Sequence, residues 1–146
     1  MSVNKQYCTF FLNGHFFGIE VMKIQEVIRY QEMTRVPLAS RAIQGLINLR
    51  GQIVTAIDLR HRLGMPERSQ EQKPTNVVVR TEEGAVSLLV DEIGDVIEVD
   101  DVGYERPPET LAESSRDLIR GVYKLKDRLL LVLETEKALN LEAGQN

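Results

Sequence analysis

Short apolar runs separated by turn-forming residues make up most of the chain. Residues 7–13 and 15–20 are two such runs, rich in aromatic side chains, and the Asn13-Gly14 pair is a strong signal for a tight β-hairpin. Further on, apolar residues recur at helical spacing and predict a helical turn leading into a third strand: Val21, Ile24, Val27 and Ile28. We therefore expect a hairpin, a short helical turn and a strand at the start of the chain.

The stretch IQGLINLRGQIVTAIDL, residues 43–59, has the pattern of two strands around a polar turn that contains Arg50 and Gly51. Asp58 is placed as the N-cap of a helix stub that reaches Leu63 and ends at Gly64. The residues that follow, ERSQEQKPT, are polar and lack apolar periodicity, so they predict an exposed linker at 67–75.

The second half of the chain again favours short strands. Strands are expected at 76–81, 85–90, 93–99, 118–125 and 129–133. Loops are expected at 106–109 and 113–115, and a closing helix at 134–141. Many short strands with few helices indicate an all-β barrel or sandwich.

An internal repeat relates the two halves. IQGLINLRGQIVTAIDLRHRL from Ile43 aligns with IRGVYKLKDRLLLVLETEKAL from Ile119 at a constant offset of 76. Gly45 then matches Gly121, and Arg50 matches Lys126. An upstream block, including Glu26, aligns at an offset of 69.

The repeat units cover approximately residues 7–66 and 75–141. Each copy is too short to bury much core alone, so the two should share an apolar interface within a single domain over residues 1–146. Gly45 and Gly121 are expected to be bulges or close-packing points, and Gly51 to make its turn.

Composition excludes several classes of function. The formal net charge is −4 and no basic run occurs, so nothing favours nucleic acid or an anionic membrane surface. The longest apolar run has five residues, and the amino terminus lacks the features of a signal peptide, which together predict a cytoplasmic protein. The single cysteine, Cys8, is expected to be a buried structural thiol.

The sequence offers little catalytic chemistry. His15 and His61 lack partners at metal-ligand spacing, and phosphate-binding loops and nucleophile elbows are absent, so we expect no catalytic residue, metal or cofactor. The acids at Asp91-Glu92, Asp95 and Asp100-Asp101 are expected to be solvated. A small hydrolase or metal enzyme would need His15 or His61 and is the weakest hypothesis.

Surface residues carry the remaining hypotheses. Four apolar residues near the first hairpin allow two interpretations: an apolar patch at an exposed rim that contacts another protein, or ordinary core. These residues are Phe10, Val21, Met22 and Ile24. Glu26 and Arg50 have side chains that could satisfy each other as a bidentate ion pair.

Three motifs together resemble the CheW-like family of bacterial chemotaxis coupling proteins: G-I-E-V-x-x-I-Q-E-V-I from Gly18, G-L-I-N-L-R-G from Gly45 and I-V-T-A-I-D-L-R from Ile53. The resemblance covers about residues 7–141. It implies two intertwined five-stranded SH3-like β-barrels with short helices. It also implies a cytoplasmic, non-enzymatic adaptor that links transmembrane chemoreceptors to a chemotaxis histidine autokinase in receptor arrays.

The resemblance also assigns residues. It implies that Phe10, Val21 and Ile24 contact the regulatory domain of the kinase, while Glu26 and Arg50 are needed for receptor coupling. The receptor tip would lie in the groove between the barrels.

Two features differ from this pattern or between the repeats. Thr55 stands where the family commonly has proline, which places the local strand edge in question. Asp127-Arg128 in the second copy has lost the Arg-Gly character of the first.

An alternative from a different class is a regulatory module of a longer kinase or adaptor-receiver protein. The start at Met1 and the polar end favour a standalone adaptor. A further alternative is an adaptor of a chemosensory pathway that controls an output other than swimming.

Overall fold

The computed structural model describes residues 4–109 and 113–140 as a mostly β fold. The strands are β1 (Asn4–Leu12), β2 (His15–Glu20), β3 (Ile24–Ile28), β4 (Ile43–Leu49), β5 (Gln52–Asp58), β6 (Thr75–Thr81), β7 (Gly84–Val90), β8 (Glu92–Asp100), β9 (Tyr104–Glu105), β10 (Ile119–Lys124) and β11 (Leu129–Leu133). The helical segments are η1 (Val21–Lys23), α1 (Leu59–Arg62), η2 (Asp101–Gly103), α2 (Glu113–Arg116) and α3 (Thr135–Leu139).

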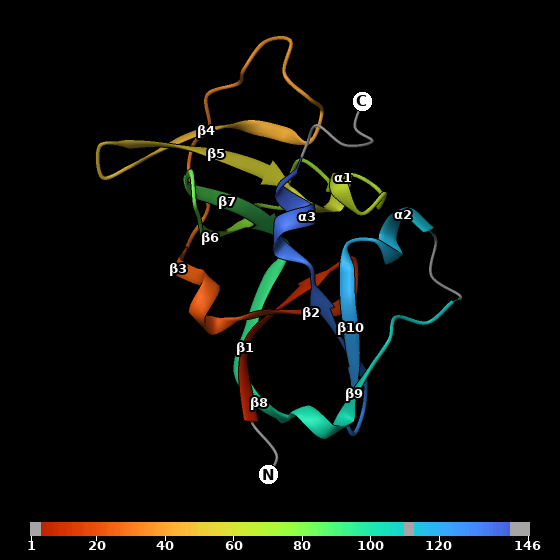
Figure 1. Cartoon of the computed structure of the whole chain (residues 1–146). Coiled ribbons are helices and arrows are strands. Elements are labelled where there is room, and N and C mark those ends of the chain that lie inside the picture. The colour runs from red at the N-terminus through yellow and green to blue at the C-terminus, as the bar shows by residue number, and fades with distance from the viewer. Residues whose placement is uncertain (1–3, 110–112, 141–146) are drawn as a thin grey trace.

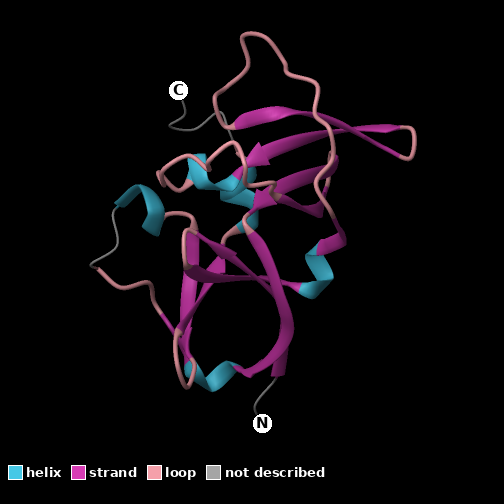
Figure 2. Cartoon of the chain, turned by 180° about the vertical axis from the view of Figure 1, so that it is seen from behind, coloured by secondary structure: helices cyan, strands magenta, loops and turns pink. Residues whose placement is uncertain are grey.

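The strands form two sheets, which Figure 1 shows one above the other. Sheet A has the order β8-β1-β2-β11-β10-β9, and sheet B has the order β3-β6-β7-β5-β4. Seen from behind in Figure 2, the lower sheet, sheet A, curves strongly around its own interior. Sheet A has a sixth strand beyond the five expected, because the two-residue β9 pairs with β10.

Each sheet takes a hairpin from the other half of the sequence. The β1–β2 hairpin lies in sheet A between β8 and β11, while the corresponding β6–β7 hairpin lies in sheet B between β3 and β5. Parallel pairings, β11 with β2 and β5 with β7, join the halves. The two repeats are therefore intertwined, and neither sheet is built from one repeat alone.

Local signals in the sequence place most of the turns. Asn13 and Gly14 have φ angles of 49° and 82°, the two left-handed residues that a tight hairpin needs. The helical turn after this hairpin is only the single 3₁₀ turn η1. Asp58 caps α1 by accepting a hydrogen bond from the Arg60 backbone N–H at 3.1 Å.

The closing helix is shorter than expected, since α3 ends at Leu139. The last predicted residue, Leu141, lies outside the described residues. Residues 113–115, expected to be loop, all lie in α2 (Glu113–Arg116).

Apolar side chains gather in three clusters. One lies inside each barrel: Ile47, Val54, Val78 and Leu89 belong to the cluster of sheet B, and Tyr7, Tyr123, Leu130 and Val132 to that of sheet A. The third and largest includes residues of both sheets, among them Phe10, Phe17, Leu88 and Leu131. This shared core is the apolar interface that the duplication predicts.

Phe10 belongs to the shared core, so of its two interpretations the ordinary core is confirmed and the exposed rim is wrong. Its side chain is fully buried, and its ring stacks on that of Phe17 at a centroid distance of 5.7 Å. The reason is that β1 is buried on both faces: Tyr7 packs inside the sheet A barrel, whereas Phe10 packs against the other barrel. Cys8 is buried, as expected, and burial raises the pKa of its thiol.

The paired glycines Gly45 and Gly121 occupy equivalent places. Each lies at a register shift, in the β4–β5 and β10–β11 ladders respectively. A Cβ on Gly45 would come within 2.8 Å of the Thr34 carbonyl oxygen, and one on Gly121 would overlap the Tyr104 ring. Both positions therefore allow another segment to approach the strand closely.

Candidate partner-binding surface

Glu26 projects from β3, an edge strand of sheet B. The β3–β6 ladder shifts register between Ile24 and Glu26, so the strand has a bulge at Gln25. The Glu26 side chain is 21% exposed and accepts a hydrogen bond from Gln25 Nε2 at 3.2 Å. The carboxylate therefore lies at the surface with part of its hydration replaced by protein donors.

Arg50 lies at the tip of the β4–β5 hairpin. Arg50 and Gly51 have φ angles of 51° and 89°, so both residues are left-handed, as in a type I′ turn. The Asn48 side chain supports the turn, because its Oδ1 accepts a hydrogen bond from the Gly51 N–H at 2.9 Å. A left-handed conformation is unusual for arginine, so this hairpin fixes the residue in a strained but defined place.

The two side chains form a bidentate ion pair. Arg50 Nη1 donates to Glu26 Oε1 at 3.1 Å, and Nη2 donates to Oε2. The hydrogen bond from Arg50, helped by that from Gln25, lowers the pKa of Glu26, and the Glu26 carboxylate raises the pKa of Arg50. Both groups are therefore charged at neutral pH.

The ion pair connects two parts of sheet B and still leaves the arginine exposed. β3 and β4 are the two edge strands of sheet B. The ion pair therefore connects the edge strand β3 to the β4–β5 hairpin, which includes the other edge strand. The Arg50 side chain is nevertheless 67% exposed. It can therefore hold its turn against β3 and still offer guanidinium donors to another molecule.

The second repeat lacks this pair. The counterparts of Glu26 and Arg50 are Asp95 and Lys126, both of which the structure describes, and no ion pair joins them. The exposed bidentate pair thus belongs to sheet B and is not a general requirement of the barrel.

The predicted apolar residues lie around η1. Met22 is 88% exposed, whereas Val21 and Ile24 are partly buried, and Ile24 packs against the shared core. Arg80 Nη1 donates to the Met22 carbonyl oxygen at 3.3 Å and so connects η1 to β6. The structure brings these three residues together, but leaves Phe10 beneath the surface.

Thr55 is not at a strand edge. It pairs with Leu46 of β4 on one side and with Val86 of β7 on the other. Threonine therefore continues β5 as an inner strand of sheet B at this position.

A cluster of buried charges was not predicted. Asp91 accepts from Arg60 Nε at 2.8 Å and from Arg68 Nε at 2.8 Å, while Arg68 Nη1 donates to Asp58 at 3.0 Å. Asp91 also accepts from the Asn13 N–H at 2.8 Å. The side chains of this junction network, Asp58, Arg60, Arg68 and Asp91, are between 8% and 14% exposed.

The junction network corrects two predictions. Asp91 is not a solvated acid, and Arg68 is not part of a freely exposed linker. Burial raises the pKa of Asp91, but the hydrogen bonds from Arg60, Asn13 and Arg68 outweigh it and hold that pKa below its ordinary value. An aspartate directly after a buried strand, with arginines on the nearby helix, was the only signal in the sequence.

The other candidate catalytic or metal-binding residues do not cluster in the part of the chain that is described. His15 and His61 are exposed, and no cluster of three or more potential metal ligands occurs among these residues. None of the described helices is long and apolar enough to cross a bilayer.

Comparisons with known proteins agree with this fold. A family model described as the CheW-like domain matches residues 6–143. The chain is 30% identical over 146 residues to a chemotaxis protein CheW of Bacillus subtilis, covering 100% of this chain and 94% of the relative. It is 28% identical to a CheW of Treponema pallidum, covering 94% of this chain and 85% of that protein.

A solved structure is also similar. The scaffolding protein TtCheW from Thermoanaerobacter tengcongensis superposes with a TM-score of 0.81 at 26% identity, covering 90% of each chain. The expected fold of two SH3-like β-barrels is therefore confirmed. On its sequence, its fold and the extent of these matches, the chain belongs to the CheW-like domain family.

Proposed function

We propose that this protein is a non-catalytic, cytoplasmic adaptor that couples transmembrane chemoreceptors to a chemotaxis histidine autokinase. The observation that carries the proposal is the exposed Glu26–Arg50 pair on a barrel of the CheW-like family. Curated relatives are named chemotaxis protein CheW, and TtCheW is described as a scaffolding protein.

We assign the kinase contact to the apolar surface of Val21, Met22 and Ile24. An exposed methionine beside partly buried aliphatic residues offers adaptable apolar area, which protein contacts use. Phe10 contributes by packing in the same core as Ile24 and not by direct contact.

We assign receptor coupling to Glu26 and Arg50. Because the guanidinium is held by one carboxylate and remains mostly exposed, it can donate to acceptors on a receptor tip without first reorganising. The second repeat, with Asp95 and Lys126 unpaired to each other, does not offer the same arrangement.

Calorimetric titration with the regulatory domain of the cognate kinase and with the receptor signalling fragment tests the proposal. We expect both to bind, and Met22→Asp and Ile24→Asp to weaken only kinase binding, since each puts a charge into an apolar contact. Met22→Asp is the cleaner variant, because Ile24 also packs on the core. Unchanged kinase affinity in both variants would remove this surface from the interface, and binding of neither partner by the folded protein would reject the adaptor.

A further inference from the structure

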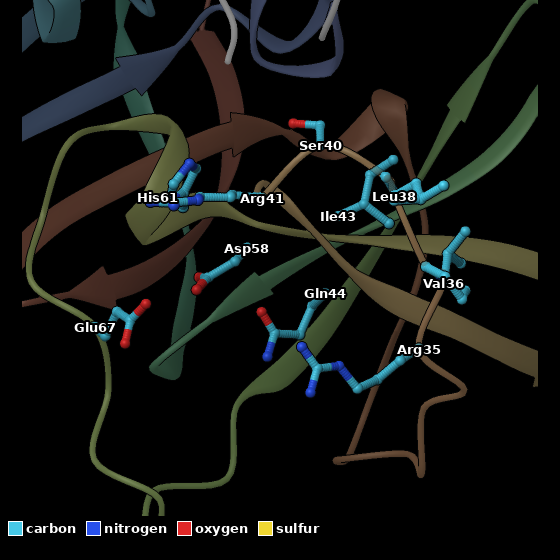
Figure 3. Close-up of a pocket in the computed structure, with 12 residues that line it drawn as sticks. Arg35, Val36, Leu38, Ser40, Arg41, Ile43, Gln44, Asp58, His61 and Glu67 are labelled. Atoms are coloured by element: carbon cyan, nitrogen blue, oxygen red, sulfur yellow. The ribbon is translucent and has the colours of Figure 1, made fainter.

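A cavity lies between the loop before β4 and the segment that contains α1. Its volume is about 650 Å³. Figure 3 shows Arg35, Val36 and Leu38 on one side of the view and Asp58, His61 and Glu67 on the other, with the Arg41 side chain overlapping His61 in this view. It lies at the Ile43 end of β4, whereas Arg50 follows the other end of that strand. The cavity is therefore separate from the Glu26–Arg50 pair.

The lining is cationic in a protein that is acidic overall. Arg35 and Arg41 both line the cavity, and among the described residues neither forms an ion pair. Of the two lining carboxylates, Asp58 is already engaged by Arg68 at 3.0 Å, which leaves only Glu67. With Asp58 paired, two arginines face one free carboxylate, so the cavity has a net positive charge. On a chain of net charge −4 this local charge points to an anionic ligand.

The rim is apolar and strained. Val36 is 38% exposed, and Leu38 is fully exposed in a left-handed conformation with φ of 64°. Leucine rarely adopts this conformation, and here it gains no buried contact in return. A strained residue that holds an apolar side chain in water suggests that a binding partner covers it.

The loop is nevertheless held at both ends. Thr34 and Leu46 exchange backbone hydrogen bonds at 2.9 and 2.8 Å, and the Asp58 N–H donates to the Ala42 carbonyl at 2.8 Å. The Ile43 N–H donates to the Ser40 carbonyl at 2.9 Å. The cavity is thus formed before any ligand arrives, which reduces the entropy lost on binding.

We propose that this cavity binds an acidic segment of a protein partner, in which carboxylates meet Arg35 and Arg41 and an apolar side chain covers Val36 and Leu38. A small inorganic anion would satisfy the arginines but leave both apolar residues in water. The proposal goes beyond the adaptor assignment and does not depend on the identity of either partner above.

The probe is an acetylated and amidated hexapeptide of sequence EELLEE, titrated into the full-length ¹⁵N-labelled protein. We expect amide shifts confined to residues 35–44 and 58–67, and loss of these shifts at high salt. The uncharged peptide QQLLQQ is expected to give none. Absence of shifts with EELLEE, or equal shifts with QQLLQQ, would overturn the proposal.

Charge-reversed variants test the arginines directly. The double variant R35E/R41E is expected to lose binding of EELLEE and to bind KKLLKK instead, whereas R106E, which reverses an exposed arginine elsewhere, keeps the original preference. Circular dichroism checks that each variant is folded. Unchanged binding of EELLEE by folded R35E/R41E contradicts the proposal.

Two other occupants remain distinguishable in the same experiment. If citrate or inorganic phosphate produces the same shifts at the same concentration as EELLEE, the cavity is a small-anion site and the proposal is wrong. If the shifts depend on protein concentration without peptide, the occupant is a second copy of the chain, which also overturns it.

Discussion

Arg50 combines a constrained backbone with a side chain that is ion-paired yet mostly exposed. Its left-handed φ and the Asn48 contact to Gly51 fix the turn, and Glu26 holds one face of its guanidinium. A residue placed in this way is suited to recognition, because little of its freedom remains to be lost on binding.

Arg50→Ala is expected to abolish receptor-dependent control of the kinase while leaving the fold intact, since an exposed ion pair adds little stability. The thermal midpoint should move by no more than about 3 °C. The matched control is Lys126→Ala, which truncates the equivalent exposed turn residue of the second repeat. Loss of folding in Arg50→Ala would mean that the pair is structural, and intact coupling would remove Arg50 from the site.

Gly45→Ala should destabilise the protein by about 1–3 kcal/mol, because the new Cβ would meet the Thr34 backbone, which has little room to move. Gly121→Ala should cost less, since the obstacle there is the far end of the Tyr104 side chain. Gly103→Ala, with ordinary contact at 3.8 Å, should stay within about 0.5 kcal/mol. Urea unfolding measures all three, and equal losses at positions 45 and 103 would contradict the close-packing account.

At the scale of elements, the junction network connects parts that lie far apart in the sequence. Asp91 sits between β7 of sheet B and β8 of sheet A, and it binds the turn of the β1–β2 hairpin, α1 and the segment after α1. The two barrels are therefore joined by charge as well as by the shared apolar core.

Asp91→Ala is expected to cost about 3 kcal/mol or more at neutral pH, because it leaves Arg60 and Arg68 buried without their main acceptor. The folded state holds the pKa of Asp91 below its ordinary value, so the stabilisation is present above that value and lost as pH falls through the folded pKa. The difference in unfolding free energy between wild type and variant should therefore shrink at acid pH.

Denaturant unfolding between pH 7 and pH 2 measures this difference in unfolding free energy between the wild type and Asp91→Ala. Asp95→Ala removes an exposed carboxylate and serves as the control, with little effect expected at any pH. A difference for Asp91→Ala that stays constant down to the most acid condition would show that the charge on Asp91 does not stabilise the fold.

Prediction from sequence succeeded where the signal is local. Asn13-Gly14, the Asp58 cap and the repeated glycines specify turns, a helix start and bulges through their own backbone chemistry. The Arg68–Asp91 contact has no such signal, since it depends on how distant segments are packed. The sequence leaves Phe10 open between surface and core, because a strand buried on both faces has no polar face to mark its orientation.

For the whole molecule, the exchange of hairpins is the decisive feature. Sequence patterns predicted the strands and the duplication, but they are equally compatible with repeats that close on themselves. Which hairpin enters which sheet is decided by long-range pairing, as in the parallel contacts of β2 with β11 and β7 with β5.

Fragments 1–69 and 70–146 are therefore expected not to fold separately. The first lacks the β6–β7 hairpin that separates β3 from β5, and the second lacks the β1–β2 hairpin that separates β8 from β11. Mixing the two should restore a dispersed amide spectrum and cooperative unfolding. A cooperative unfolding transition in either fragment alone would contradict this account.

As an adaptor, this protein would place the kinase under receptor control. The most direct measurement is autophosphorylation of the cognate kinase in receptor-containing membranes, with and without the protein and with and without receptor ligand. Kinase activity is expected to respond to receptor ligand only when the protein is present. A ligand response of equal size without the protein, or none with the folded protein and both cognate partners, would contradict it.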